Sequence, residues 1–243
     1  LKICRPQGLA GSIPARGTTF CVDSCEAHVS QTFISTSVPL WRIGRSMDSA
    51  LARFPEFSFA DCRLRCIRPD DIEQVYAGLS DPRVIAHYGV SYSSLAATRE
   101  QMLWYAQLLA DEAGIWWALA DNDDVLIGAC GFNDWHHEYR RIDMGYWLLP
   151  DYWRRGLLQQ VLPSILRHAL QAMGVHRIHL DIEPENVASW RLAEKLGFSR
   201  EGTLRDVEYK DGRYLSLHQY SLLASDQACL LYTSDAADEG LGV

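Results

Sequence analysis

Three features are scarce in this sequence of 243 residues: long apolar runs, positive charge and a regular set of cysteines. The longest strictly apolar runs, such as residues 115–120, fall far short of the roughly 20 residues that a membrane-spanning helix needs. The net charge is −8, which argues against non-specific nucleic-acid binding because such binding needs a basic surface. We therefore expect no nucleic acid and no membrane among the partners of the chain.

The cysteines number seven, an odd count without regular spacing, so they do not indicate a disulfide framework. Three of them, Cys62, Cys66 and Cys130, lie in the middle of the chain, which suits a reduced, cytoplasmic domain. Cys62 and Cys66 alternate with arginines along residues 62–68, and this period of two is typical of a half-buried strand. No second pair of ligands has metal spacing, so we predict no metal site.

The two ends differ from the middle. Residues 1–46 are net basic and lack a sustained helical or strand period, and the first methionine is Met47. We expect residues 1–46 to be upstream frame, the alternative being a flexible arm. Residues 224–243 carry four acidic and no basic side chains. Residues 229–239 resemble the translation of a transposase adapter used in sequencing libraries, so we expect the tail to be artefactual from about 229. The alternative is a natural acidic tail.

The domain is therefore expected at residues 47–223, where short strand patterns alternate with helical ones. Pro163 lies inside one predicted helix and should kink it or remove one hydrogen bond. The predicted strands span residues 62–68, 115–120, 125–132, 140–149, 177–182, 198–205 and 214–222. The predicted helices span about 70–79, a short segment from 82, 98–110, 156–173 and 187–196. This order predicts a mixed α/β (α+β) domain with a central, mostly antiparallel sheet, one βαβ crossover and flanking helices.

A cluster of two arginines and a glycine precedes the helix at 156–173. Arg154, Arg155 and Gly156 stand at its N-terminus, where unpaired N–H groups and a partial positive charge favour a phosphate. Gly156 allows the backbone to approach an anion closely, and arginines add charge-assisted hydrogen bonds. The pattern indicates a phosphate-binding turn, although many helices begin with basic residues.

Several motifs follow one another in order along the middle segment. They are Met144–Gly156 (MGYWLLPDYWRRG), Glu185–Ser189 (ENVAS), Glu194–Phe198 (EKLGF) and Glu201–Gly202. Together they resemble the GCN5-related N-acetyltransferase (GNAT) superfamily, and within it the branch of ribosomal-protein alanine and serine N-acetyltransferases. The resemblance covers about residues 62–223.

This resemblance implies acetyl-CoA as cofactor and acyl donor. The backbone N–H groups of 154–159 would bind its pyrophosphate, and Leu158 stands where the family has a small residue. A bulge in strand 145–149 would hold the thioester carbonyl, Asn186 would bind the pantetheine arm, and the strands at 140–149 and 177–182 would splay around that arm. The implied cofactor-binding residues are Tyr146, Trp147, Leu148, Arg154, Arg155, Gly156, Leu157, Leu158, Gln159 and Asn186.

The resemblance also implies catalytic residues. Many members use a tyrosine seven residues after the asparagine as acid, but Ala193 occupies that position here. Ser189 is then the candidate acid for the leaving thiolate, the alternative being a hydroxyl that caps the first helical turn. Glu208 is the candidate base for the amine, the alternative being a solvated charge at a strand end.

Other side chains are open to two interpretations. The pair His136 and His137 could flank the acceptor site as base or metal ligand, but two adjacent histidines are more typical of a polar loop. Tryptophans at 104, 116, 117 and 135 could line the acceptor cleft, but such residues more often form core.

We therefore expect an acetyl-CoA-dependent N-acetyltransferase acting by direct attack in a ternary complex. The acceptor is an amine, either a protein N-terminus or an amine-bearing small molecule. The alternative is a catalytically inactive CoA-binding regulatory module. The sequence gives no oligomeric state.

Overall fold

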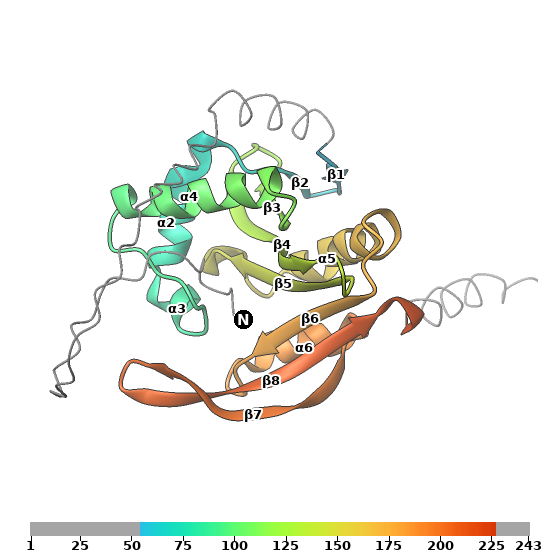
Figure 1. The fold of residues 1–243 in the computed structure, drawn as a ribbon. Coiled ribbons are helices and arrows are strands. Elements are labelled where there is room, and N and C mark those ends of the chain that lie inside the picture. Colours follow the sequence, from blue (N-terminus) through green and yellow to red (C-terminus); the bar gives the residue numbers. More distant parts are fainter. Residues whose placement is uncertain (1–53, 227–243) are drawn as a thin grey trace, which may run out of the picture.

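The computed structural model describes residues 54–226, which form one eight-stranded sheet with helices on both faces (Figure 1). The strands lie in the order β1-β2-β3-β4-β5-β6-β8-β7. Neighbouring strands are antiparallel except β5 and β6, which are parallel and joined by a helical crossover. The strands are β1 Phe57–Ser58, β2 Cys62–Cys66, β3 Ile115–Asp121, β4 Leu126–His136, β5 Arg141–Leu148, β6 Arg177–Ile182, β7 Ser199–Lys210 and β8 Arg213–Leu223. The predicted fold class is confirmed.

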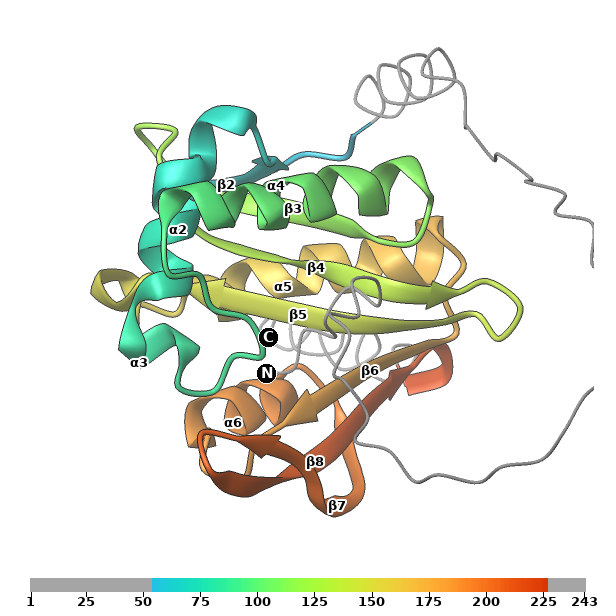
Figure 2. The same cartoon turned by 60° about the vertical axis from the view of Figure 1, so that its left-hand side comes forward.

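The helices occupy two layers. In both views the α2–α4 layer covers one face of the sheet and α5 the opposite face, while α6 lies beside β6 and β8 (Figures 1 and 2). Pro163 lies within α5, and a π-helical turn follows that helix at 168–172. The helices are α2 Ile72–Ser80, α3 Pro82–Ile85, α4 Leu95–Ala110, α5 Leu157–Arg167 and α6 Val187–Lys195. None of the helices in residues 54–226 is long and apolar enough to cross a membrane.

The core is densest at β3 and β4, which bury side chains on both faces. Trp117 is fully buried, and its ring lies within 6.2 Å, centroid to centroid, of Phe54, Phe57, Phe132 and His168. Its indole N–H also donates to the carbonyl of Pro55 at 2.6 Å. Trp116 is buried as well, so the core interpretation is confirmed for these two tryptophans, whereas Trp104 and Trp135 are half-buried at the edge of the core.

The predicted half-buried strand at 62–68 is wrong in one respect. Its period of two places Arg65 on a solvent-facing side, but Arg65 is only 1% exposed. Its guanidinium donates two hydrogen bonds of 2.8 Å to Asp71 and one of 2.6 Å to Asp124. Hydrogen bonds from Arg63, Arg65 and Arg68 hold the pKa of Asp124 well below its usual range. The arginine is tolerated in the interior because two carboxylates neutralise it there.

Several boundaries differ from the expected ones. The helix expected at 98–110 begins at Leu95, because the Ser94 hydroxyl accepts the N–H of Ala97 and caps it. The helix expected at 156–173 is α-helical only to Arg167. The last two strands form a longer hairpin than expected. Its full length could not be predicted because β7 carries polar side chains on both faces and shows no apolar alternation.

The parallel pairing of β5 and β6 stops early. Its partners are Arg141 with Arg177, Ile142 with Ile178 and Asp143 with His179. Beyond this point the two strands separate, so the expected splay is confirmed. The bulge expected at 145–149 is absent from the pairing with β4, which runs in register from Asp143 to Leu148. The register shift in that pair lies instead between Asn133 and His136.

Candidate active site

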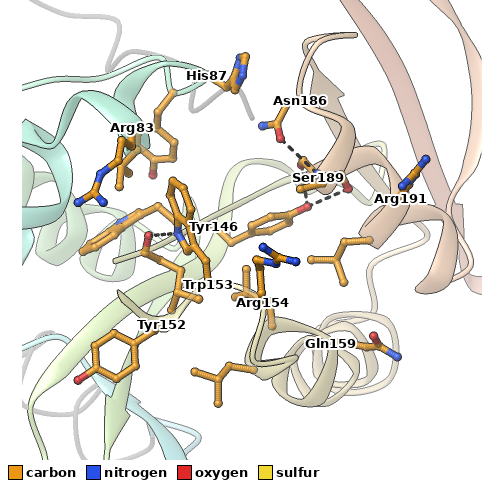
Figure 3. A pocket seen from close by; sticks show the side chains of 18 of the residues that line it. Arg83, His87, Tyr146, Tyr152, Trp153, Arg154, Gln159, Asn186, Ser189 and Arg191 are labelled. Atoms are coloured by element: carbon orange, nitrogen blue, oxygen red, sulfur yellow. Dashed lines mark hydrogen bonds between the residues drawn. The ribbon is translucent and has the colours of Figure 1, made fainter. Parts of the chain in front are cut away.

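A cavity of about 680 Å³ opens where β5 and β6 separate. Its wall is built from the segment around α3, the end of β5, the N-terminus of α5 and the first turns of α6 (Figure 3). Nine of the ten predicted cofactor-binding residues line this wall: Tyr146, Trp147, Leu148, Arg154, Gly156, Leu157, Leu158, Gln159 and Asn186. Ser189 lines it too, whereas Arg155 and Glu208 do not.

One end of the cavity is the N-terminus of α5. Gly156 is the residue before this helix and has φ 76°, and an added Cβ there would meet no atom within 4 Å. No side chain caps the first N–H groups of α5, so they remain available for an anion. Arg154 lines the cavity, while the Arg155 guanidinium lies 4.9 Å from the centroid of the Tyr152 ring, outside it. Open space, unpaired donors and one cationic side chain fit a pyrophosphate group.

The end of β5 is fixed from both sides of the sheet. Trp147 is buried against α2 and α4: its indole N–H donates to the Tyr105 hydroxyl at 3.3 Å. A Cβ on Gly78 would come within 2.2 Å of the Trp147 ring, so only glycine fits at that position of α2. Trp153 donates its indole N–H to the carbonyl of Leu148 at 2.7 Å and thereby binds the end of the strand where β6 no longer does.

Two hydroxyl groups meet in the middle of the cavity. The Tyr146 Oη and Ser189 Oγ atoms are 2.9 Å apart and both side chains are buried (Figure 3). Burial raises the pKa of Tyr146 well above its usual value, so its phenol stays protonated at neutral pH. Asn186 accepts the N–H of Ser189 at 3.2 Å and caps α6. The capping role that was the alternative for Ser189 is therefore filled by Asn186.

The candidate base Glu208 lies elsewhere. It is half-buried in β7, opposite Leu215 of β8, and does not line the cavity. Its hairpin nevertheless reaches the cavity wall through Lys210, whose ammonium donates to the carbonyls of Ile85, Ala86 and Tyr88 at 2.8, 3.2 and 3.2 Å. The hairpin and the α3 segment are thus joined across the opening.

The histidine pair at 136 and 137 is also outside the cavity. One ring nitrogen of His137 is 2.8 Å from the Glu112 carbonyl, and its ring stacks at 4.0 Å on Trp135. Within residues 54–226 no group of three histidine, cysteine, aspartate or glutamate side chains is arranged to hold a metal. Sequence patterns missed His87, which lines the cavity from the turn after α3 and belongs to none of the motifs.

The sheet splits beside an uncapped helix N-terminus, and two hydroxyl groups lie between its halves, an arrangement that suits acyl transfer. The family described as "Acetyltransferase (GNAT) domain" matches residues 61–199, more than half of the chain. The chain therefore belongs to the GNAT acetyltransferase family and is an acyltransferase.

One relative by sequence and two solved structures with the same fold illustrate the similarity. The chain is 32% identical over 162 residues to the uncharacterized N-acetyltransferase YoaA of Bacillus subtilis, covering 66% of this chain and 92% of that protein. The solved ribosomal-protein-S5-alanine acetyltransferase of Vibrio fischeri superposes with a TM-score of 0.64 at 20% identity, covering 71% of this chain and 98% of that one. Spermidine N-acetyltransferase of Vibrio cholerae, solved with CoA and spermine, gives 0.60 at 20% identity and covers 67% and 95%.

Proposed function

We propose that the chain transfers the acetyl group of acetyl-CoA to a primary amine by direct attack in a ternary complex. The observation that carries this proposal is that one cavity joins an anion-binding helix N-terminus to a buried hydroxyl pair. Bound acetyl-CoA supplies the thioester whose carbonyl carbon the amine attacks. The residues present fit this molecule, because the open space at Gly156 and the free donors of α5 suit its pyrophosphate.

The protein binds and orients the donor at three places. The N–H groups of 157–159 and the Arg154 guanidinium hold the pyrophosphate. Asn186, at the start of α6, offers its amide N–H₂ to the pantetheine arm while its Oδ1 caps the helix. The backbone of Tyr146, Trp147 and Leu148 lines the gap between β5 and β6 and polarises the carbonyl.

The hydroxyl pair supplies the proton for the leaving sulfur. Ser189 Oγ donates its proton to the thiolate and recovers one from Tyr146 Oη, 2.9 Å away. The tyrosine is suited to this because burial keeps it protonated. It takes the place of the tyrosine that many family members carry seven residues after the asparagine, where this chain has the buried Ala193.

The acceptor is an amine on a protein N-terminus or on a small molecule. Among the relatives, one is named for a ribosomal protein and another for spermidine, so both kinds of acceptor occur on this fold. The net charge of −8 favours a cationic acceptor of either kind.

The proposal is tested on the full chain in two steps, first by the binding of acetyl-CoA and then by turnover. Acetyl-CoA at 100 times its Kd should stabilise the fold by about 2.7 kcal/mol, which for this size is roughly 5–10 °C in Tm. Pantetheine, which lacks the pyrophosphate, should give a much smaller shift. Thiol release is then measured with N-terminal peptides and small amines. If acetyl-CoA binds but no amine causes thiol release, the chain is an inactive CoA-binding module. If acetyl-CoA causes no shift in Tm, both the enzyme and the binding module are excluded.

A further inference from the structure

A histidine and a glutamate from distant parts of the chain meet beside the cavity. The His87 Nδ1 atom is 2.9 Å from Glu183 Oε2, although 96 residues separate them in sequence. Glu183 follows β6 directly and its side chain is only 7% exposed, while His87 follows α3 and is 31% exposed. The buried carboxylate thus fixes the ring of a histidine that reaches the cavity.

The position of His87 complements the groups already described. In Figure 3 it lies at the end of the cavity opposite Arg154 and Gln159, with the Ser189–Tyr146 hydroxyl pair between them. The far end of the cavity holds the donor's pyrophosphate under the proposed function. The end at His87 is therefore where the amine acceptor meets the thioester.

The backbone around His87 is held as firmly as its ring. Lys210 of β7 donates to the carbonyls of Ala86 and Tyr88, the two residues flanking His87. Tyr88 is 4% exposed and anchors the segment in the core. A histidine with a fixed backbone and one ring nitrogen bound to a carboxylate has the arrangement that orients a general base.

We propose that His87 is the general base that takes a proton from the acceptor amine, and that Glu183 is its positioning residue. This assignment rests on the proposed function and replaces Glu208, which lies outside the cavity. The charged groups near His87 in the described residues include Glu183 after β6, which binds its ring, and Lys210 of β7, which binds the carbonyls beside it. Arg83 of α3 is paired with Asp81.

These residues and solvent account for every proton in the reaction. The nitrogen–carbon bond forms while the carbon–sulfur bond breaks, and the acceptor ammonium loses two protons in all. One passes to the His87 imidazole and from there to solvent. The other replaces the proton that Ser189 and Tyr146 give to the sulfur, so both hydroxyls are restored.

The test compares His87→Gln and Glu183→Gln with wild type on the full chain. Glutamine can still donate to Glu183 but cannot accept a proton, so kcat of His87→Gln should fall about 100-fold at neutral pH. Its pH–rate profile should lose the ascending limb that a histidine base produces. Glu183→Gln should lower kcat about tenfold and displace that limb. The Kd for acetyl-CoA, measured by calorimetry, should stay within about twofold for both variants.

The matched control is His176→Gln, an exposed histidine outside the cavity, which should leave the profile unchanged. An active wild type whose kcat and pH profile survive in His87→Gln would overturn the base assignment. A wild type that consumes no acetyl-CoA with any amine would overturn the proposed function before any variant is made. Should Glu183→Gln fail to fold, the His87 comparison alone decides.

Discussion

The two walls of the cavity are stabilised in different ways. On the β5 side, β3 and β4 are buried on both faces, and their aromatic side chains, such as Trp117 and Phe132, pack against each other. On the β6 side, β7 is exposed along most of its length, and Tyr209 and Tyr214 are each about two-thirds exposed. The first wall is held by close packing, which resists gradual deformation. The second has few buried side chains along β7 and is joined to the α3 segment by separate polar contacts, among them His87 with Glu183 and Lys210 with three carbonyls.

Trp117→Ala should show the largest effect on stability. Removing this fully buried ring leaves a cavity among four aromatic rings and an unpaired Pro55 carbonyl, at a cost of about 3–5 kcal/mol. The comparison variant is Tyr214→Ala on the hairpin, which is 67% exposed and should change the free energy of unfolding by no more than about 0.5 kcal/mol. Urea unfolding measures both. Equal losses would show that the two walls are not stabilised differently.

Gly156→Glu should reduce acetyl-CoA affinity at least 100-fold, because the carboxylate would occupy the phosphate approach and repel it. Gly174→Glu is a closely matched control: Gly174 also has a positive φ, 70°, also has open space for a Cβ, and lies outside the cavity. Both variants should lose similar stability from backbone strain, but calorimetry should detect lost binding only at 156. Equal affinity in the two variants would remove the α5 N-terminus from the cofactor site.

Ser189→Ala should lower kcat roughly 10- to 100-fold with an unchanged Kd for acetyl-CoA, since Asn186 still caps α6. Tyr146→Phe should act in the same direction, and the double variant should be little worse than Ser189→Ala because both serve one proton path. The control is Ser80→Ala, whose hydroxyl donates to a carbonyl of its own helix. A wild-type kcat in Ser189→Ala would make the hydroxyl pair purely structural.

Glu201 should give the smallest effect. Hydrogen bonds from Arg177, and then from Ser221, lower its pKa to about 2. A lowered pKa stabilises the fold above the unfolded pKa, about 4.3, and this contribution is lost as pH falls toward 2. Because the carboxylate is 43% exposed, solvent screening keeps the effect below about 1 kcal/mol. The stability difference between wild type and Glu201→Gln, measured by urea unfolding, should shrink from pH 5 to pH 2.

Much of the fold follows from local pattern. The strands at 115–121 and 177–182 and the helix at 187–195 lie where apolar period and capping residues predict them. The buried Arg65 was not predictable in this way, because its carboxylate partners come from a turn 59 residues later and from the next helical turn. Likewise the hairpin is longer than predicted, since exposed polar strands leave no periodic trace.

The residues of the candidate site likewise divide into those that belong to a local sequence motif and those that do not. Gly156, Asn186 and Ser189 belong to short motifs at helix starts, and such motifs can be found in one sequence without a structure. His87 becomes a candidate only when the chain folds its turn against the end of β6. A pair 96 residues apart has no local signature, whereas Glu208 was predicted from the family resemblance of its hairpin.

Because the β5–β6 pairing ends early, part of the sheet lacks the hydrogen bonds that would join these two strands. Beyond Asp143 and His179 the backbone amides and carbonyls that point into the gap have no strand opposite them, and at Leu148 the Trp153 indole substitutes for one. A backbone polar group stabilises a protein interior only once it is paired. Under the proposed function, a ligand that carries amide groups along an extended chain would pair with these groups. Exchange of these amide hydrogens with solvent should slow when that ligand is bound.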